Sequence, residues 1–216
     1  MLEKMADFFE ARLDGYEEHM LTCIQGAREF YPFTARQLPL DPTAQILDLG
    51  CGTGLELTYY FEINPSAHVT GIDLSAEMLA TLREKFSHMA LTTIQGSYFD
   101  LPLGKNVFDA AVSVESLHHF TKEEKIPLYR KICAALKPGG YFVLTDYFAS
   151  SEEDERFFRA ELLRLKSEQS LPDDEFYHYD TPLTLAHEIE ALRMADFSDV
   201  EVLGNWGATY LLKAQK

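Results

Sequence analysis

The feature with the clearest chemical meaning is a glycine-rich loop at residues 48–54, which reads Asp-Leu-Gly-Cys-Gly-Thr-Gly. It separates a short apolar run from a helical pattern, and glycines at such a junction let the backbone turn sharply and approach a ligand closely. Its glycines stand at positions 50, 52 and 54. A dinucleotide-binding loop, Gly-x-Gly-x-x-Gly, would need its third glycine at Leu55 instead. The loop therefore predicts a ligand-binding turn and disfavours an NAD-dependent oxidoreductase.

A carboxylate further along the chain could bind the same ligand. Asp73 closes the next apolar run, nineteen residues after Gly54. The two oxygens of a carboxylate can accept both hydroxyl hydrogens of a ribose. NAD-binding enzymes share this device, and a helix-capping role before Ser75 is the alternative. Together with the glycine loop, Asp73 favours a nucleoside ligand.

These features and two later segments resemble the motifs of the class I methyltransferases that use S-adenosyl-L-methionine (SAM). Residues 96–103 are similar to the adenine-contacting loop of that family, and residues 108–120 contain the Leu-His-His that often ends its fourth-strand segment. The motifs occur in the expected order and span about residues 44–148. The resemblance implies a transferase that binds SAM and releases S-adenosyl-L-homocysteine.

The resemblance also implies which residues contact SAM. The glycine loop would surround the methionine part, with Asp48 facing its amino group, and Asp73 would bind the ribose. Ser97 and Tyr98 stand where the adenine loop usually has Asp and Ala, so a weaker acceptor replaces a carboxylate. The full set of expected contacts is Asp48, Gly50, Cys51, Gly52, Gly54, Asp73, Leu74, Ser97, Tyr98 and Ser113.

The acceptor side is predicted from the residues after the fourth apolar run. Methyl transfer from SAM is an in-line displacement, so the protein mainly aligns the acceptor and excludes water. If a base is needed, His118 is the first candidate, because imidazole titrates near neutral pH. The alternative is a helix cap or a SAM contact without proton transfer. We expect the acceptor pocket to include Glu115, His118, Tyr147, Tyr177 and His178.

Composition excludes several other classes. The three cysteines form no Cys-x-x-Cys pair and the seven histidines show no His-x-x-x-His spacing, which predicts neither a disulfide framework nor a metal site. The 216 residues carry a formal net charge of −16 without a basic patch, which opposes binding to nucleic acid or to an anionic membrane. No membrane span or signal peptide is evident. We therefore expect a cytoplasmic monomer or homodimer.

The expected function is SAM-dependent methylation of a small molecule. Residues 113–116 lack the Asn/Asp-Pro-Pro-aromatic element of the enzymes that methylate amino groups of nucleic acids. One alternative is a protein that senses SAM or uses it without methyl transfer. A less favoured alternative is an NAD-dependent oxidoreductase.

An alternation of strands and helices must position these residues. Short apolar runs at 46–49, 69–72, 91–94, 107–114 and 141–144 alternate with helical segments at 55–62, 75–86 and 122–136. This pattern predicts an α/β fold with a mainly parallel, doubly wound sheet. Runs at 200–203 and 210–212 predict an antiparallel C-terminal hairpin. The resemblance implies a Rossmann-like sheet of seven strands.

The domain organisation follows from a change of pattern near residue 41. Before it, apolar residues recur every three or four positions, which predicts a helical segment that Pro32 and the segment 38–42 bring to an end. Gly15 and Gly26 weaken the case for one unbroken helix. We interpret residues 1–40 as a helical lid, with plain packing on the domain as the alternative, and residues 41–216 as the SAM-binding domain. A helical insertion at 150–195 is expected to shape the acceptor pocket.

Overall fold

The chain folds around one seven-stranded sheet, described here from a computed structural model that covers residues 1–172 and 174–216. The strand order is β3-β2-β1-β4-β5-β7-β6. The first five strands pair in parallel, and β7 runs antiparallel to both of its neighbours. The strands are β1 (Gln45–Leu49), β2 (His68–Asp73), β3 (Leu91–Gln95), β4 (Phe108–Val114), β5 (Leu136–Tyr147), β6 (Asp199–Trp206) and β7 (Thr209–Gln215). This arrangement confirms the predicted α/β fold with its antiparallel C-terminal hairpin.

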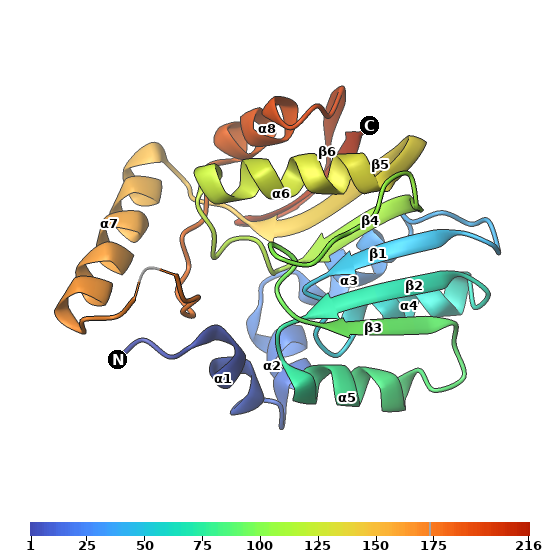
Figure 1. Cartoon of the computed structure of the whole chain (residues 1–216), viewed down its shortest axis with the longest axis horizontal. Helices are drawn as coiled ribbons and strands as arrows, with labels where there is room; N and C mark the ends of the chain where they lie inside the picture. Colours follow the sequence, from blue (N-terminus) through green and yellow to red (C-terminus); the bar gives the residue numbers. More distant parts are fainter. Residues whose placement is uncertain (173) are drawn as a thin grey trace.

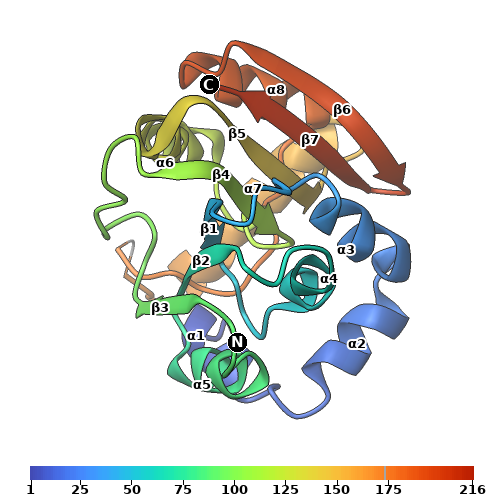
Figure 2. The same cartoon turned by 90° about the vertical axis from the view of Figure 1, so that its right-hand side faces the viewer.

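Helices cover both faces of the sheet (Figure 2). Apolar side chains of α3, α4 and α5 form one core against the sheet, and those of α6 and α8 contribute to the other. This is the layering that a parallel sheet requires, because both of its faces are apolar. The helices are α1 (Met5–Glu10), α2 (Tyr16–Cys23), α3 (Ala27–Ala35), α4 (Leu55–Ile63), α5 (Ala76–Lys85), α6 (Lys122–Ala135), α7 (Glu152–Glu168) and α8 (Leu185–Met194).

The N-terminal segment differs from the single helical stripe that the periodicity predicts. It forms the three short helices α1, α2 and α3, and the breaks fall at Gly15 and Gly26. Both glycines have φ near 80° and precede a new helix, in a backbone region that favours glycine. Pro32 does not end the last helix, because α3 continues past it to Ala35, and the helical segment ends before the predicted stop at 38–42.

The segments outside the sheet and the helices that cover its two faces gather at the carboxyl edge of the sheet. Helices α1 and α7 lie beyond the carboxyl ends of the parallel strands (Figure 1). The backbone of residues 3–5 pairs with that of residues 176–178 through two hydrogen bonds of 3.0 Å. In α/β folds the ligand site lies at this edge. No helix in the described part of the chain combines the length and apolarity needed to cross a membrane.

Candidate active site

The glycine loop joins β1 to α4 at the carboxyl edge. The N–H groups of Gly50 and Cys51 both donate to the carbonyl of Ile72, at 2.8 and 3.2 Å, which holds the turn against β2. Gly50 has φ 72°, and a Cβ there would lie 2.0 Å from Oγ of Ser116. Gly52 has φ 48°, and its Cβ would point into open space. Packing therefore requires glycine at position 50, whereas the open side of Gly52 leaves room for a ligand.

Asp73 ends β2 beside this turn. One carboxylate oxygen accepts a hydrogen bond from the N–H of Gly52 and the other from the N–H of Ser75, both at 2.9 Å. Burial raises the pKa of Asp73, and these N–H groups oppose the increase. Each oxygen keeps a lone pair for a further donor. The side chain therefore fits the ribose-binding role that the family resemblance implies.

Asp48 is fully buried at the end of β1. Neither carboxylate oxygen accepts a hydrogen bond from an N–H or hydroxyl donor among the described residues, and the group with which Asp48 can share a proton is the carboxyl group of Glu56. Burial, and then the nearby carboxyl group of Glu56 on α4, raises the pKa of Asp48 well above its ordinary value. Burial also raises the pKa of Glu56. A buried carboxyl group without a donor costs free energy, and the ammonium group of SAM is a donor of the kind that this site lacks. Asp48 thus fits the cofactor.

A small cavity of about 50 Å³ lies beside the glycine loop. Part of its wall comes from five predicted SAM contacts: Gly50, Gly52, Asp73, Leu74 and Tyr98. Helices α1 and α2 close the cavity from the other side with Met5, Ala6, Phe9 and Tyr16. The N-terminal helices therefore cover the surface on which the cofactor is expected.

A larger cavity of about 880 Å³ lies next to the small one. Its lining includes four of the predicted acceptor residues: Glu115, His118, Tyr147 and His178. Residues of α1 and α2 and of the β6–β7 hairpin complete the wall. Four residues line both cavities: Phe9, Tyr16, Glu115 and His119. A molecule in the larger cavity would thus lie next to a ligand on the glycine loop.

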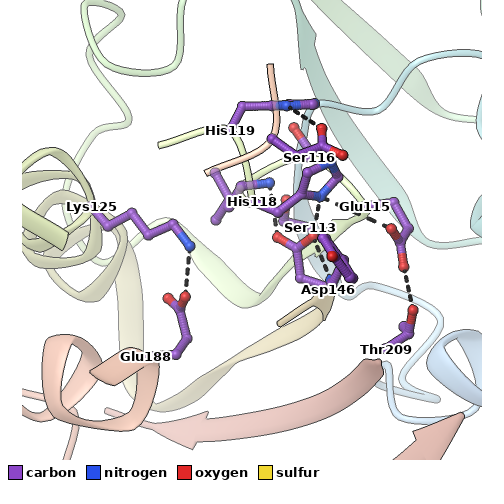
Figure 3. A network of polar contacts seen from close by, with 12 residues as sticks. Ser113, Glu115, Ser116, His118, His119, Lys125, Asp146, Glu188 and Thr209 are labelled. Carbon is purple, nitrogen blue, oxygen red and sulfur yellow. Dashed lines mark hydrogen bonds and ion pairs between the residues drawn. The ribbon is translucent and has the colours of Figure 1, made fainter. Parts of the chain in front are cut away.

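His118 is held by a carboxylate at the end of β5. Its Nδ1 lies 2.6 Å from Oδ1 of Asp146, and both side chains are buried (Figure 3). Burial lowers the pKa of His118, but the charge of Asp146, together with that of Asp180 and Glu115, raises it to about 9. An imidazole with this pKa is protonated at neutral pH. The structure therefore does not favour the predicted role of His118 as a general base.

The other ring nitrogen of His118 faces a second carboxylate. Oδ1 of Asp180, in the segment between α7 and α8, lies 3.6 Å from Nε2 of His118 and 3.3 Å from Nδ1 of His119. The N–H of Thr181 donates to the carbonyl of His118 at 2.8 Å, which ties the two segments together. Sequence reasoning missed Asp146 and Asp180, because they are distant in the chain and no local spacing links them to the histidines.

Glu115 lies where the two cavities meet. Its φ of 49° is unusual for a residue other than glycine, and such strained conformations cluster at functional sites. Its Oε1 accepts a hydrogen bond from the hydroxyl of Thr209 at 3.0 Å (Figure 3). Burial, and then the charge of Asp146, raises the pKa of Glu115 to about 7. The turn after β4 thus aims a titratable carboxyl group at the junction.

Several predicted SAM contacts line neither cavity. Asp48 is enclosed beneath the loop, the side chain of Cys51 packs against β2, and Gly54 faces α5. The hydroxyl of Ser97 accepts a hydrogen bond from a backbone N–H two residues later, at 3.2 Å. Ser113 donates to a carbonyl of β1 at 2.8 Å. The two serine hydroxyls are thus used within the fold, and neither faces the cavities.

Tyr177 requires a correction to the predicted acceptor pocket. It lines a separate cavity together with residues of α6 and α7, and its hydroxyl donates to Glu175 at 3.0 Å. Its neighbour His178 lines the larger cavity and stacks on Phe8, with 3.4 Å between the ring centroids. In an extended segment consecutive side chains point to opposite sides, which separates these two aromatic residues.

Sequence comparison agrees with this geometry. Residues 46–140 match the family described as methyltransferase domain. A fatty-acid O-methyltransferase from Mycolicibacterium smegmatis is 31% identical over 118 residues, which make up 55% of this chain and 42% of that protein. The mouse (Mus musculus) protein named Probable tRNA methyltransferase 9B is 28% identical over 123 residues, or 56% of this chain and 26% of that one. The chain spans less than half the length of either relative.

Structure comparison supports the same fold. A chain from the complex between the Haloferax volcanii Trm112 methyltransferase activator and a methyltransferase superimposes with a TM-score of 0.69 at 18% identity. The match covers 100% of this chain and 99% of that one. The glycine loop, Asp73 and the sheet order lie in the expected places, and the match of residues 46–140 to the methyltransferase domain family supports the predicted resemblance to the class I SAM-dependent methyltransferases.

Proposed function

We propose that this protein transfers the methyl group of SAM to a small molecule held in the larger cavity. The observation that carries the proposal is that the two cavities share four lining residues, Phe9, Tyr16, Glu115 and His119. SAM supplies an activated methyl group on a positively charged sulfur. What the protein must add is alignment of donor and acceptor and exclusion of water.

On the cofactor side, three residues carry the proposed contacts. Asp73 accepts the ribose hydroxyls with the lone pairs that its backbone hydrogen bonds leave free. The buried Asp48 accepts from the amino group, directly or through water. The open face of Gly52 lets the ligand approach the backbone. On the acceptor side, Glu115, Tyr147 and His178 line the larger cavity, which has the size of a typical small-molecule site.

The N-terminal helices act as a lid in this proposal. A cavity of about 50 Å³ holds one or two water molecules, whereas ligand pockets measure roughly 300–1,000 Å³. SAM can therefore enter only if α1 moves away from the start of α5. The contacts of α1 there include a hydrogen bond of 3.3 Å between Ser75 and Glu10. The helix would close again over the bound cofactor and exclude water.

The acceptor class rests on size and charge. The larger cavity is bounded by helices and loops, and the chain carries a net charge of −16, which opposes docking of a polyanion such as tRNA. The fatty-acid methyltransferase among the relatives acts on a small molecule, whereas the mouse relative is named for tRNA. We therefore propose a small-molecule acceptor, and we test tRNA as the alternative acceptor.

The test measures binding and transfer separately. Calorimetry should detect SAM but not NAD, and Asp73→Ala should weaken SAM binding at least tenfold, since a carboxylate with two hydroxyl partners is lost. Asp199→Ala, at an exposed acid on β6 outside both cavities, is the matched control. SAM with a labelled methyl group is then incubated with a metabolite extract and, separately, with tRNA. Label in a small molecule supports the proposal. Label in tRNA refutes the acceptor class, and SAM binding without any transfer favours a sensor.

A further inference from the structure

We propose that His118, His119 and Asp180 form a binding site for one divalent first-row transition-metal ion on the wall of the larger cavity. The inference replaces the sequence-based prediction of no metal, because the fold brings together donors that local spacing does not connect. It is independent of the proposed methyl transfer, since a metal can bind here whether or not SAM does.

The first observation is the spacing of the three donor atoms. Oδ1 of Asp180 lies 3.3 Å from Nδ1 of His119 and 3.6 Å from Nε2 of His118. One donor atom from each of the three residues can be chosen so that all three lie within 4.8 Å of one another. With metal–ligand bonds of about 2.1 Å, separations of this size correspond to angles of roughly 104° and 118° at the metal. These angles are close to those of a tetrahedral site.

The second observation is that these contacts are long for hydrogen bonds. Charge-assisted N–H···O bonds usually measure about 2.7–2.9 Å, and His118 reaches Asp146 at 2.6 Å with its other nitrogen. The same imidazole thus makes one close hydrogen bond and one contact about 1 Å longer. This spacing leaves room for a metal ion between the ring nitrogens and the carboxylate oxygen, at a place where Nδ1 of His119 otherwise faces the carbonyl oxygen of Tyr179 at 3.3 Å.

The third observation is the support behind His118. Histidines that bind metals commonly donate their second N–H to a carboxylate, which fixes the ring and its tautomer. Asp146 does this through Nδ1, and its other oxygen accepts from the N–H of Leu117 at 2.9 Å. Nε2 of His118 is then the nitrogen that faces Asp180, and it can bind a metal only by releasing the proton that it carries in the metal-free protein at neutral pH. A buried carboxylate that holds the histidine in this way is typical of metal sites in proteins.

The donor set indicates the class of metal. Two imidazole nitrogens and one carboxylate suit zinc, iron or cobalt, whereas magnesium and calcium prefer oxygen ligands. Three protein ligands leave at least one coordination position open, as in catalytic rather than structural sites. The side chain of Asp180 is 46% exposed, so an ion can reach the site from the cavity. The open position would therefore take an oxygen or nitrogen atom of a molecule bound in that cavity.

The test uses the tag-free full chain after dialysis against EDTA. Co²⁺ is titrated while its visible absorption is recorded, and the bound metal is counted after equilibrium dialysis. We expect one Co²⁺ per chain, displaced by Zn²⁺ but not by an equal concentration of Mg²⁺. Asp180→Asn should weaken Co²⁺ binding at least tenfold, and Asp146→Asn, behind the ligands, should weaken it roughly 10–100-fold.

The matched control is Asp14→Asn, which removes the same charge from the same cavity but lies outside the donor cluster. It should leave Co²⁺ affinity within about twofold of the parent. Three results would overturn the inference: no stoichiometric Co²⁺ binding, equal losses in Asp14→Asn and Asp180→Asn, or displacement of Co²⁺ by equal Mg²⁺. Circular dichroism establishes that each variant folds. Because Asp180 is half-exposed, its variant tests the site even if Asp146→Asn does not fold.

Discussion

Asp48→Asn should make this protein more stable and a poorer SAM binder. The carboxyl group is fully buried, neither oxygen has an N–H or hydroxyl donor among the described residues, and its neighbour is the carboxyl group of Glu56, with which it can bond only when one of the two is protonated. Asparagine has nearly the same shape, carries no charge and offers two N–H donors to Glu56. The substitution thus removes an electrostatic cost from the folded state without creating a void.

The magnitude follows from the cost of the buried group. An unsatisfied buried polar group costs about 1–3 kcal/mol, and more if it is charged. Asp48→Asn should therefore raise the free energy of unfolding by about 1–3 kcal/mol at pH 7. For a chain of this size each kcal/mol corresponds to roughly 2–4 °C in Tm. The exposed Asp199 provides the control, since Asp199→Asn should change stability by at most about 0.5 kcal/mol.

The pH dependence has a definite sign. Because the pKa of Asp48 is raised in the folded state, the folded protein binds more protons than the unfolded chain above pH ~4. Its stability should therefore fall as the pH rises from the unfolded pKa towards the raised folded pKa. In Asp48→Asn this contribution disappears, so the gain over the parent should grow across that window.

Urea unfolding at several pH values tests the predicted gain in stability, and SAM calorimetry tests the predicted loss of affinity. SAM affinity should fall about 10–100-fold in Asp48→Asn, because a charge-assisted hydrogen bond contributes about 1.5–3 kcal/mol. A loss of stability in this variant would show that Asp48 is satisfied in a way the structure does not reveal. Unchanged SAM affinity would remove Asp48 from the cofactor site.

Two further predictions concern the lid and the core. SAM binding should change amide hydrogen exchange in residues 5–10 but not in α8, because α1 must move to enlarge a cavity of about 50 Å³. If SAM binds without changing hydrogen exchange in α1, the proposed lid is refuted. Glu188→Ala should lower the free energy of unfolding in urea by about 3–5 kcal/mol. The substitution removes the partner of Lys125, a fully buried side chain whose Nζ lies 2.6 Å from the Glu188 carboxylate (Figure 3). Glu190→Ala breaks an exposed pair between the same helices and should cost at most about 1 kcal/mol; equal losses would contradict this reading of the buried pair.

The strands and the cofactor side could be read from the sequence because they depend on local pattern. Apolar runs that alternate with amphipathic segments must form a covered parallel sheet, and glycines at fixed offsets after a strand mark the turn where a ligand approaches. The N-terminal segment shows the limit of periodicity. Its apolar stripe continues through Gly15 and Gly26, but the left-handed backbone at both glycines divides it into three helices.

The acceptor side depends on tertiary structure. Histidines after β4, Asp146 at the end of β5 and Asp180 beyond α7 meet because parallel strands end at one edge and a long insertion folds back over it. Tyr177 and His178 are adjacent in the chain, yet they line different cavities. The sequence by itself predicted the family resemblance, the strands and the glycine loop, since these rest on local residue patterns. Only the fold decided which distant carboxylates surround His118, and therefore how that residue is charged and what it can bind.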